Sequence, residues 1–348
     1  TISNAYCAFD TKRYRYVHID CPGHGDYVTE MIAGAYQMNA AIVVVSAVEG
    51  VMPQTCEHLL HARHAGVRAL VVFLSMMDRV EDNELAELAE METRMLLDRC
   101  GYDGAGVPAI RGSARDALEH AIDSKQTQCI SDLLEALDKT VVTPKWDEQG
   151  PFFMPINQSF VLPGRGTILT GRVDSGRVGP RDSLELVGGD HRREAVKVKA
   201  IECFRESIPE AKAGHLVGIM VRGGRHEYDR RFRVLAGLGS TGLHDSFWAD
   251  IQVLEPELGG RWKPIRNGYE PFFHFRTARV PGRLLMPKRH RKAPPGDRVT
   301  ARVRLFRPVV VQPGWAFSAR EGHRTILFGH IRELICRERT QVALSGLC

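Results

Sequence analysis

An aspartate, a glycine and a histidine stand close together directly after a short apolar segment. They are Asp20, Gly23 and His24, and residues 16–19 before them have the composition of a strand. A carboxylate at the carboxyl end of a strand can hold Mg²⁺ through water, and the N–H of a turn glycine can meet a γ-phosphate. The imidazole can orient an attacking water, with an ordinary surface histidine as the alternative. The spacing therefore favours phosphate chemistry.

A second carboxylate follows another apolar segment. Asp78 stands just after the predicted strand 69–74, where it can accept both the ring and the exocyclic N–H groups of guanine. The alternative is a cap on the helix predicted to begin near Asn83. Ser113 and Ala114 follow the predicted strand 108–112 and would form a further wall of the same base pocket.

The elements that must position these residues alternate between strands and amphipathic helices up to about residue 143. Such alternation predicts a doubly wound parallel sheet covered by helices. The expected strands are 16–20, 40–47, 69–74 and 108–112, and the expected helices are 26–35, 57–65, 83–100 and 132–140.

Beyond residue 150 the apolar residues recur with period two, and glycine-rich turns separate the segments. Strands are expected over 166–173, 183–187 and 195–201, and a second block of strands from about 246 to 335. Short strands without helices between them predict two antiparallel β-barrels. The expected domains are 1–143 (α/β), 151–240 (first barrel) and 246–335 (second barrel), followed by a C-terminal extension over 336–348.

Composition and charge narrow the class of protein. The chain has 348 residues, of which 43% are hydrophobic and 26% charged. No apolar segment reaches the roughly 18 residues that a membrane-spanning helix needs, so we expect no membrane insertion. The net charge is +5, with basic clusters at 284–292 and 191–193 that form either a solvated face or contacts with RNA phosphates. Eight scattered cysteines without a C-x-x-C pair indicate reduced thiols.

Several longer segments together carry a family resemblance. They are V-H-I-D-C-P-G-H-G-D-Y-V at 17–28, M-P-Q-T-C-E-H-L-L at 52–60, R-G-S-A at 111–114, P-F-F-M-P-I at 151–156, G-R-G-T-I-L-T-G-R-V at 164–173, G-Y-E-P-F-F-H-F-R-T at 268–277 and R-E-G-H-R-T at 320–325. With them the chain resembles elongation factor Tu of the bacterial and organellar type. The resemblance implies a GTPase-like α/β domain with two β-barrels, and a GTP-dependent carrier that delivers aminoacyl-tRNA to the ribosome.

The resemblance also implies roles for single residues. GTP or GDP with Mg²⁺ would be the cofactors. At the phosphate end of the nucleotide, Thr1 and Asp20 would bind Mg²⁺, Gly23 would contact the γ-phosphate, and His24 would be the catalytic residue. At the base, Asp78 would recognise guanine, and Ser113 and Ala114 would form the pocket wall. In the first barrel, Glu202 and Arg205 would contact the terminal adenosine of tRNA.

The guanine motif departs from the family pattern. The family has Asn-Lys-x-Asp, whereas this chain has Ser75-Met76-Met77-Asp78. Ser75 cannot supply the paired donor and acceptor of an amide, and each lost buried hydrogen bond costs roughly 1–3 kcal/mol. Met76 can pack under a base as a lysine stem does, but without the charge. We expect weakened guanine binding.

The pocket for the aminoacyl end departs at four positions. Tyr6 replaces a histidine, Asn157 and Gln158 replace an acidic pair, and Leu216 replaces an asparagine. Loss of both carboxylates removes the electrostatic test for a free α-amino group, so recognition of aminoacylated tRNA should weaken.

Three substitutions alter the surface of the second barrel. Trp262 and Lys263 replace His-Thr, and Glu270 replaces an arginine, which places a negative charge where a phosphate is expected. The basic run 288–292 is an addition that can make new RNA contacts.

The phosphate loop G-x-x-x-x-G-K-[ST] and its strand would precede Thr1 in the family. No other segment of the sequence replaces them, so we expect this polypeptide not to hydrolyse GTP by itself. The missing strand would lie beside residues 16–19, and we expect a further segment or another chain to cover that edge.

Three functions remain open. The first is a component with eroded sites, a pseudo-GTPase, that binds the RNA and protein of a mitochondrial ribosome or of its assembly intermediate. The second is a working mitochondrial elongation factor that binds tRNA. The third is a protein-binding scaffold outside translation that uses residues 52–58. The expected location is the mitochondrial matrix, with a plastid or the bacterial cytoplasm as alternatives.

Overall fold

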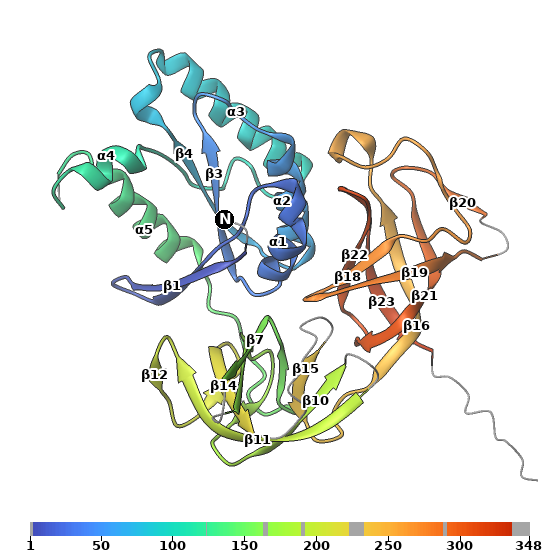
Figure 1. Cartoon of the computed structure of the whole chain (residues 1–348). Coiled ribbons are helices and arrows are strands. Elements are labelled where there is room, and N and C mark those ends of the chain that lie inside the picture. The colour runs from blue at the N-terminus through green and yellow to red at the C-terminus, as the bar shows by residue number, and fades with distance from the viewer. Residues whose placement is uncertain are drawn as a thin grey trace, which may run out of the picture.

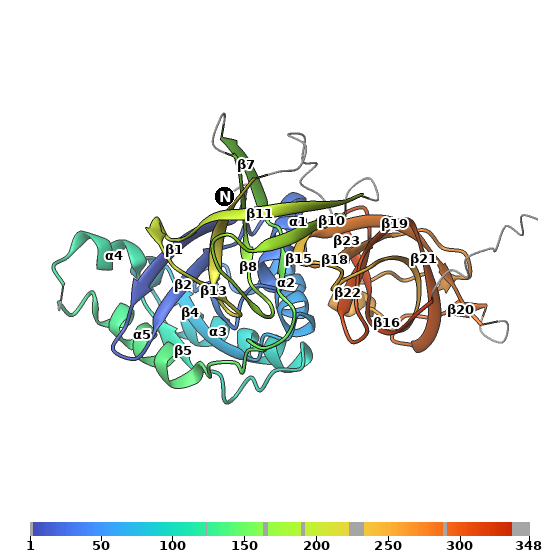
Figure 2. The ribbon, with the colours of Figure 1, turned by 90° about the horizontal axis from the view of Figure 1, so that it is seen from below.

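The computed structural model describes residues 3–122, 124–162, 166–188, 192–222, 233–287 and 291–335. Figure 1 shows an α/β domain coloured blue to green, a first β-barrel in green and yellow, and a second β-barrel in orange and red. Figure 2 shows the same three parts from below, with the second barrel at one end. The predicted fold class, an α/β domain followed by β-barrels, is confirmed. Among the described residues, no helix has both the length and the apolar character to cross a membrane.

A three-stranded parallel sheet forms the centre of the α/β domain. Strand β4 is buried at Leu70–Leu74, which fits a parallel strand covered on both faces. The helices α2 and α3 pack on one side of the sheet, and α5 packs on the other through Ala136 and Leu137. The elements are β3 (Ala40–Ser46), β4 (Ala69–Ser75), β5 (Ala109–Arg111), α1 (Val28–Ala35), α2 (Pro53–His64), α3 (Asn83–Arg99), α4 (Ala114–Glu119) and α5 (Gln128–Thr140).

Strands β1 (Ala5–Asp10) and β2 (Arg15–Asp20) form a separate antiparallel hairpin. The carboxylate of Asp138 on α5 holds this hairpin by accepting hydrogen bonds from Thr11 Oγ1 at 2.8 Å and from Tyr16 OH at 3.0 Å. The strand predicted over 16–20 therefore exists, but its predicted place in the parallel sheet is wrong. In the described part of the chain it pairs with β1 alone.

The division of the sheet leaves apolar side chains uncovered. Val44 of β3 is 62% exposed and Val17 of β2 is 39% exposed. A continuous sheet with helices on both faces buries such residues. Among the described residues, no strand pairs with the outer edge of β2 or of β3.

The first barrel is an antiparallel sheet in the order β6-β15-β10-β11-β14-β8-β7, with β12 paired to β11. It wraps around an apolar core that includes Met154, Leu169 and Ile219. Its strands are β6 (Phe153–Pro155), β7 (Gln158–Leu162), β8 (Gly166–Arg172), β9 (Arg177–Val178), β10 (Ser183–Gly188), β11 (Arg192–Cys203), β12 (Glu206–Ser207), β13 (Ala211–Lys212), β14 (Leu216–Arg222) and β15 (Val234–Gly237).

The second barrel closes fully in the order β16-β21-β19-β18-β22-β23. Buried phenylalanine rings fill it, and the rings of Phe247 and Phe275 meet edge to face at 5.8 Å. Its strands are β16 (Leu243–Val253), β17 (Ile265–Arg266), β18 (Phe272–Phe275), β19 (Ala278–Leu285), β20 (Lys292–Ala293), β21 (Arg298–Val310), β22 (Ala316–Glu321) and β23 (Arg324–Leu334), and the short turn η3 (Pro256–Leu258) follows β16.

The three parts meet at a polar junction. Asp174 of the first barrel accepts hydrogen bonds from Arg172 Nη2 at 2.9 Å and from Arg276 of the second barrel. Arg172 also donates to the carbonyl of Gln37 in the α/β domain at 2.7 Å. Tyr36 OH of the α/β domain donates to Ala316 O of the second barrel at 3.0 Å. These contacts fix the relative positions of the three parts.

Candidate functional site

The proposed phosphate-sensing residues lie on the turn after β2. Asp20 ends the strand, and Gly23 and His24 lead into the short turn η1 (Gly25–Tyr27) and then α1. A Cβ added to Gly23 would meet no atom within 4 Å, so the space beside its backbone is open. This arrangement leaves room for a ligand at the start of a helical segment.

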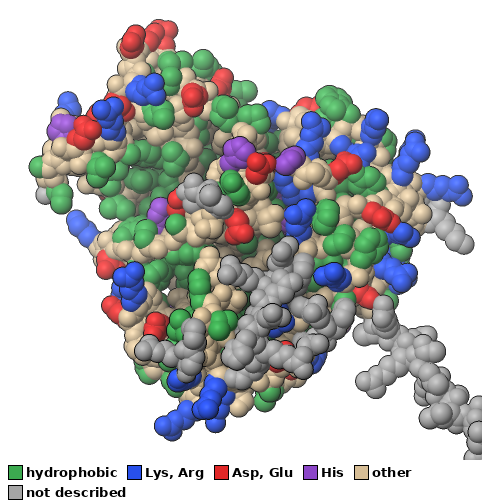
Figure 3. Space-filling view, in the orientation of Figure 1, with side chains coloured by type: hydrophobic (Ala, Val, Ile, Leu, Met, Phe, Trp, Pro, Cys, Tyr) green, Lys and Arg blue, Asp and Glu red, His purple; other side chains and the backbone are tan. Residues whose placement is uncertain are grey.

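The side chain of His24 caps the start of the turn η1. Its Nδ1 accepts a hydrogen bond from the N–H of Asp26 at 3.3 Å and lies 3.6 Å from the Asp26 carboxylate, while the side chain is 71% exposed. Asp26 also lies 3.4 Å from the imidazole of His323 in the second barrel. Figure 3 shows histidine and acidic side chains gathered where these two parts meet. His24 is therefore placed where a ligand or a partner can reach it.

The described residues supply little of a magnesium site. Mg²⁺ is held by several oxygen ligands. Thr1 lies outside the described residues, and those that are described contain no group of three or more His, Cys, Asp or Glu arranged around a metal position. Asp20 can provide one ligand, and the rest of the set is not formed by these residues.

The predicted guanine loop and base-pocket wall lie side by side. Met76 adopts a left-handed backbone with φ 63°, which is uncommon for a residue with a side chain, and the turn η2 (Met77–Arg79) follows. The N–H of Met77 donates to Gly112 O at 3.3 Å, which joins the loop after β4 to the segment after β5. The parallel strands thus bring Ser75–Asp78 next to Ser113 and Ala114.

The side chains of this loop are used within the protein. Ser75 Oγ donates to Val45 O of the neighbouring strand at 3.2 Å. Met76 is 40% exposed, and its sulfur accepts from Ser46 Oγ at 3.5 Å. Neither side chain presents the amide or the ammonium group that would contact a purine.

Asp78 is exposed, and its charge acts on Arg115. The hydrogen bond from Arg115 to Glu119 is the main reason that the pKa of Arg115 is raised, and Asp78 contributes to the same shift. The alternative in which Asp78 caps the next helix is wrong, because Asp82 Oδ1 accepts from the N–H of Glu84 at 2.9 Å and caps α3.

Ser113 has a clear local role. It is 7% exposed, and its Oγ accepts from the N–H of Asp116 at 3.1 Å, which caps α4. Ala114 is the first residue of that helix. A base in this pocket would therefore meet mainly backbone groups at Ser113.

Two residues predicted for the aminoacyl pocket are in direct contact. Asn157 Nδ2 donates to Gln37 Oε1 at 2.6 Å and lies 3.4 Å from Tyr6 OH. Burial raises the pKa of Tyr6, so its hydroxyl stays neutral. Gln37, which follows α1, is a member of this cluster that sequence reasoning missed, because no local pattern marks it.

Three other predicted residues share one face of the first barrel. Gln158 stands opposite Thr170, Thr170 opposite Gly218, and Gly218 opposite Glu202. Leu216 lies two residues from Gly218 on β14, on the same face.

This face turns toward the α/β domain. Leu216 stands opposite Arg172, which donates to the carbonyl of Gln37. The structure thus joins Tyr6 and Asn157 across two parts of the molecule, and it places Gln158, Leu216 and Glu202 on one face of the first barrel.

Arg205 lies at the end of the same face. It is exposed and occupies the turn between β11 and β12 with φ 69°, next to Phe204 with φ 49°. Glu202 stands just before this turn. The two residues predicted to hold the terminal adenosine therefore lie at one end of β11.

The negative charge predicted to repel phosphate is balanced. Glu270 Oε1 accepts from Arg283 Nε at 2.7 Å. Trp262 is 77% exposed, and Lys263 beside it is exposed as well. The basic run 288–292 lies only partly within the described residues, and the extension 336–348 lies outside them.

Two family models match the chain. One is the elongation factor Tu GTP binding domain, which matches residues 1–143. The other is the elongation factor Tu C-terminal domain, which matches residues 240–335. The two matches cover the α/β domain and the second barrel.

Proposed function

Since the chain belongs to the elongation-factor-Tu-like translation GTPases, we propose that it has weakened GTP and aminoacyl-tRNA sites and serves as a binding or structural component of a mitochondrial ribosome or of its assembly intermediate. The family implies GTP or GDP with Mg²⁺ as ligands, and ribosome and tRNA as partners. The observation that carries the proposal is the loop after β4.

That loop keeps one of the three side chains that can contact guanine in the family and lacks the other two. Asp78 is exposed and can accept the N–H groups of the base, whereas Ser75 donates to the neighbouring strand and Met76 carries no charge. Each missing hydrogen bond costs roughly 1–3 kcal/mol, so binding should be weaker by one to a few powers of ten, roughly.

The residues of the aminoacyl pocket also indicate weakened binding, here of aminoacyl-tRNA. Asn157 and Gln158 are neutral amides, and Asn157 donates a hydrogen bond to Gln37. A cationic α-amino group gains little from amides compared with carboxylates. Selection of charged over uncharged tRNA is therefore proposed to be weak.

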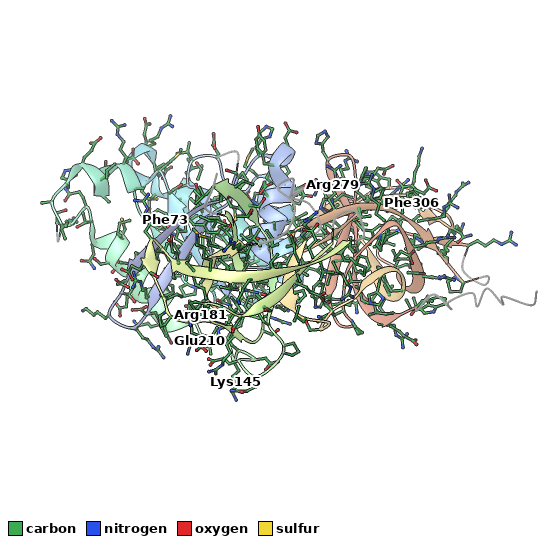
Figure 4. The ribbon with its side chains drawn as sticks, turned by 60° about the horizontal axis from the view of Figure 1, so that its bottom comes forward. Phe73, Lys145, Arg181, Glu210, Arg279 and Phe306 are labelled. Atoms are coloured by element: carbon green, nitrogen blue, oxygen red, sulfur yellow. The ribbon has the colours of Figure 1, made fainter. Side chains whose placement is uncertain are left out.

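The second barrel offers a surface suited to RNA. Arg283 stands opposite Arg304 on neighbouring strands, and the guanidinium of Arg279 lies 4.3 Å from the centre of the Phe272 ring. Lys and Arg side chains gather over this barrel in Figure 3, and Figure 4 shows Arg279 and Phe306 on its outer side. Cations interleaved with aromatic rings can contact phosphates and stack on bases.

Nucleotide affinity tests the proposal most directly. We expect the full-length gene product to bind GDP with a Kd weaker than about 10 µM, and the double variant Ser75→Asn, Met76→Lys to bind at least about tenfold more tightly. Fluorescence titration with a labelled GDP gives both values. Met91→Lys adds the same charge on the exposed face of α3 and should leave the Kd unchanged. A Kd in the low micromolar range for the unaltered protein would sink the proposal.

Association with ribosomal RNA is tested separately. Tagged protein from mitochondrial extracts should sediment with ribosomal particles, and Arg304→Glu should weaken the association in a salt-dependent manner. Lys145→Glu makes the same change of charge away from the second barrel, at the lower edge of the molecule in Figure 4, and should have little effect. Partners recovered without ribosomal RNA would favour the scaffold outside translation. For that scaffold, residues 52–58 offer less surface than expected, because Glu57 and His58 are half-buried.

A working elongation factor is the second candidate. The observation in its favour is that, in the described part of the chain, β2 pairs only with β1 and β3 only with β4, while Asp20, Gly23 and His24 lie at the end of β2. A further strand there could bring a phosphate loop to these residues. A GTP-dependent complex between the full-length gene product and aminoacyl-tRNA would support this candidate, and its absence at micromolar concentrations would remove it.

A further inference from the structure

Helix α2 meets the second barrel mainly through polar side chains. Glu57, His61 and His64 recur at the spacing of one helical face, and all three contact the barrel. The ring of Phe328 on β23 packs against both imidazoles, with centres 5.1 Å from His61 and 4.6 Å from His64. The contact therefore depends on hydrogen bonds and one ion pair more than on buried apolar surface.

The hydroxyl of Thr325 fixes the hydrogen on His61. Thr325 Oγ1 donates its one hydrogen to Glu57 Oε1 at 2.7 Å, so His61 Nε2, which lies 2.9 Å away, must donate to Thr325. The same carboxylate oxygen forms the ion pair with Arg320. A further proton on His61 would therefore add a second positive charge beside a carboxylate that Arg320 already uses. Burial and the charge of Arg320 lower the pKa of His61 well below its usual value.

His64 lies about one turn further along α2 and is held by backbone groups of the barrel. Its Nε2 donates to the carbonyls of Phe317 and Gly329. Its ring centre lies 4.7 Å from that of His330 on β23. Burial lowers the pKa of His64 to about 4, His330 contributes to the shift, and the two carbonyls oppose it. The closed contact thus favours neutral imidazoles at both positions of α2.

Other polar groups at this contact lack partners. Ser318 stands opposite Phe328, on the barrel face that meets α2. In the described part of the chain, the Oγ of Ser318 and the Nε2 of His58 are buried without a hydrogen-bond partner. Such atoms regain hydrogen bonds when water reaches them. His58 and the buried His274 also lie close enough to oppose a positive charge on His61. Each of these features makes the contact easier to open.

The two barrels are held to each other in a different way. Their apolar side chains form one cluster, with Phe153 from the first barrel and Val310 and Trp315 from the second. Arg276, whose guanidinium lies 4.2 Å from the centre of the Trp315 ring, pairs with Asp174 across the same border. This described cluster contains no histidine, so uptake of protons by histidines leaves the two barrels together.

We propose that the contact between α2 and the second barrel is a proton-sensitive switch: protonation of His61 and His64 in acid separates the α/β domain from the second barrel, while the two barrels stay together. Histidine in water takes up a proton near pH 6.5. The open form, in which the rings reach water, therefore binds protons more readily than the closed form. The closed form is favoured above about pH 6.5, and the open form gains as the pH falls toward 4.

The neighbouring contacts decide how the molecule would open. Tyr36 OH donates to Ala316 O at the junction of the three parts, which makes this junction the pivot. Asp26 and His323 lie 3.4 Å apart at the edge of the contact, and a proton on His323 would oppose the opening. These two side chains are 59% and 80% exposed, so solvent screens their attraction. This inference does not depend on the proposed function.

Small-angle X-ray scattering of the full chain tests the proposal, with far-ultraviolet circular dichroism on the same samples. A compact chain of this length has a radius of gyration of about 20 Å. We expect this radius to rise reversibly by roughly a tenth between pH 6.5 and pH 4.5, while the circular dichroism stays unchanged. His120→Gln is the control, because this exposed histidine at the end of α4 lies outside the contact, and the variant should open over the same pH range.

The double variant His61→Gln, His64→Gln identifies the groups that take up the protons. Its amides can still donate to Thr325 and to the barrel carbonyls, but they do not titrate, so the midpoint of opening should fall by roughly one pH unit or more. Where the double variant fails to fold, His64→Gln alone should lower the midpoint by a smaller amount. A constant radius in the unaltered protein, loss of circular dichroism at the same pH as the expansion, or an unchanged midpoint in folded variants would overturn the proposal.

Discussion

Gly171 lies on β8 of the first barrel, at a close approach to β6. A Cβ added at this position would stand 2.2 Å from Pro155 O, a backbone atom of β6 that cannot move aside alone. The close approach of β8 to β6 helps the ends of the sheet meet around the apolar core. One missing side chain therefore contributes to the shape of this barrel.

We expect Gly171→Ala to destabilise the protein by about 1–3 kcal/mol, because the strands must separate to admit the methyl group. Chemical denaturation measures the change. Gly179→Ala is the matched control, since the nearest atom to an added Cβ is 3.7 Å away, and this variant should be unchanged or slightly more stable. Equal losses in the two variants would contradict the account.

Single residues also show what could be predicted from the sequence. The weakness of the guanine motif follows from residue types alone, because serine and methionine lack the required groups. The hydrogen bond of Ser75 to Val45 and the proximity of Asp78 to Arg115 depend on neighbouring strands and loops. Such contacts join residues distant in sequence, and no local pattern indicates them.

Two aspartates precede α3, and the structure shows which of them caps this helix. Asp82 accepts a hydrogen bond from the N–H of Glu84, whereas Asp78 lies on the preceding turn. Asp82→Ala should therefore cost about 1 kcal/mol of stability through the lost cap. Asp78→Ala should change the free energy of unfolding by less than about 0.5 kcal/mol. Denaturant unfolding of both variants checks this, and the reverse order of effects would restore Asp78 as the cap.

At the scale of elements, helices and buried strands were predicted well. Apolar periodicity predicted the positions of α2, α3, α5, β3 and β4, each within a few residues. The strand β1 was not predicted, since its alternation is weak and its partner is β2. The separation of β2 from the parallel sheet was also missed, because strand pairing is decided by contacts across the fold rather than by local composition.

At the scale of the whole molecule, histidines join the α/β domain to the second barrel. His64 of α2 lies 2.9 Å from Phe317 O and 3.1 Å from Gly329 O through its Nε2, which must therefore carry the hydrogen. His61, on the same helix, lies 2.9 Å from Thr325 Oγ1. Burial lowers the pKa of His64 to about 4, and the nearby His330 contributes to this shift.

The sign of the pH dependence follows from this shift. An unfolded histidine takes up a proton near pH 6.5, whereas His64 in the folded protein does so only near pH 4. The stability linked to His64 is therefore fully present above about pH 6.5 and is lost as the pH falls toward 4. At pH 5 the expected loss from this residue is about 2 kcal/mol.

His64→Gln separates this effect from general acid unfolding. The amide of glutamine can still donate to the carbonyls of Phe317 and Gly329, but it does not take up a proton. Between pH 7.5 and pH 5, the variant should therefore lose about 2 kcal/mol less stability than the unaltered protein, as measured by denaturant unfolding at both values. His24→Gln is the control for the substitution itself, because this histidine is 71% exposed and lies on the turn before α1, outside the contact between α2 and the second barrel. If the unaltered protein and His64→Gln lose the same amount, protonation at the contact between α2 and the second barrel does not govern the stability of the molecule in acid.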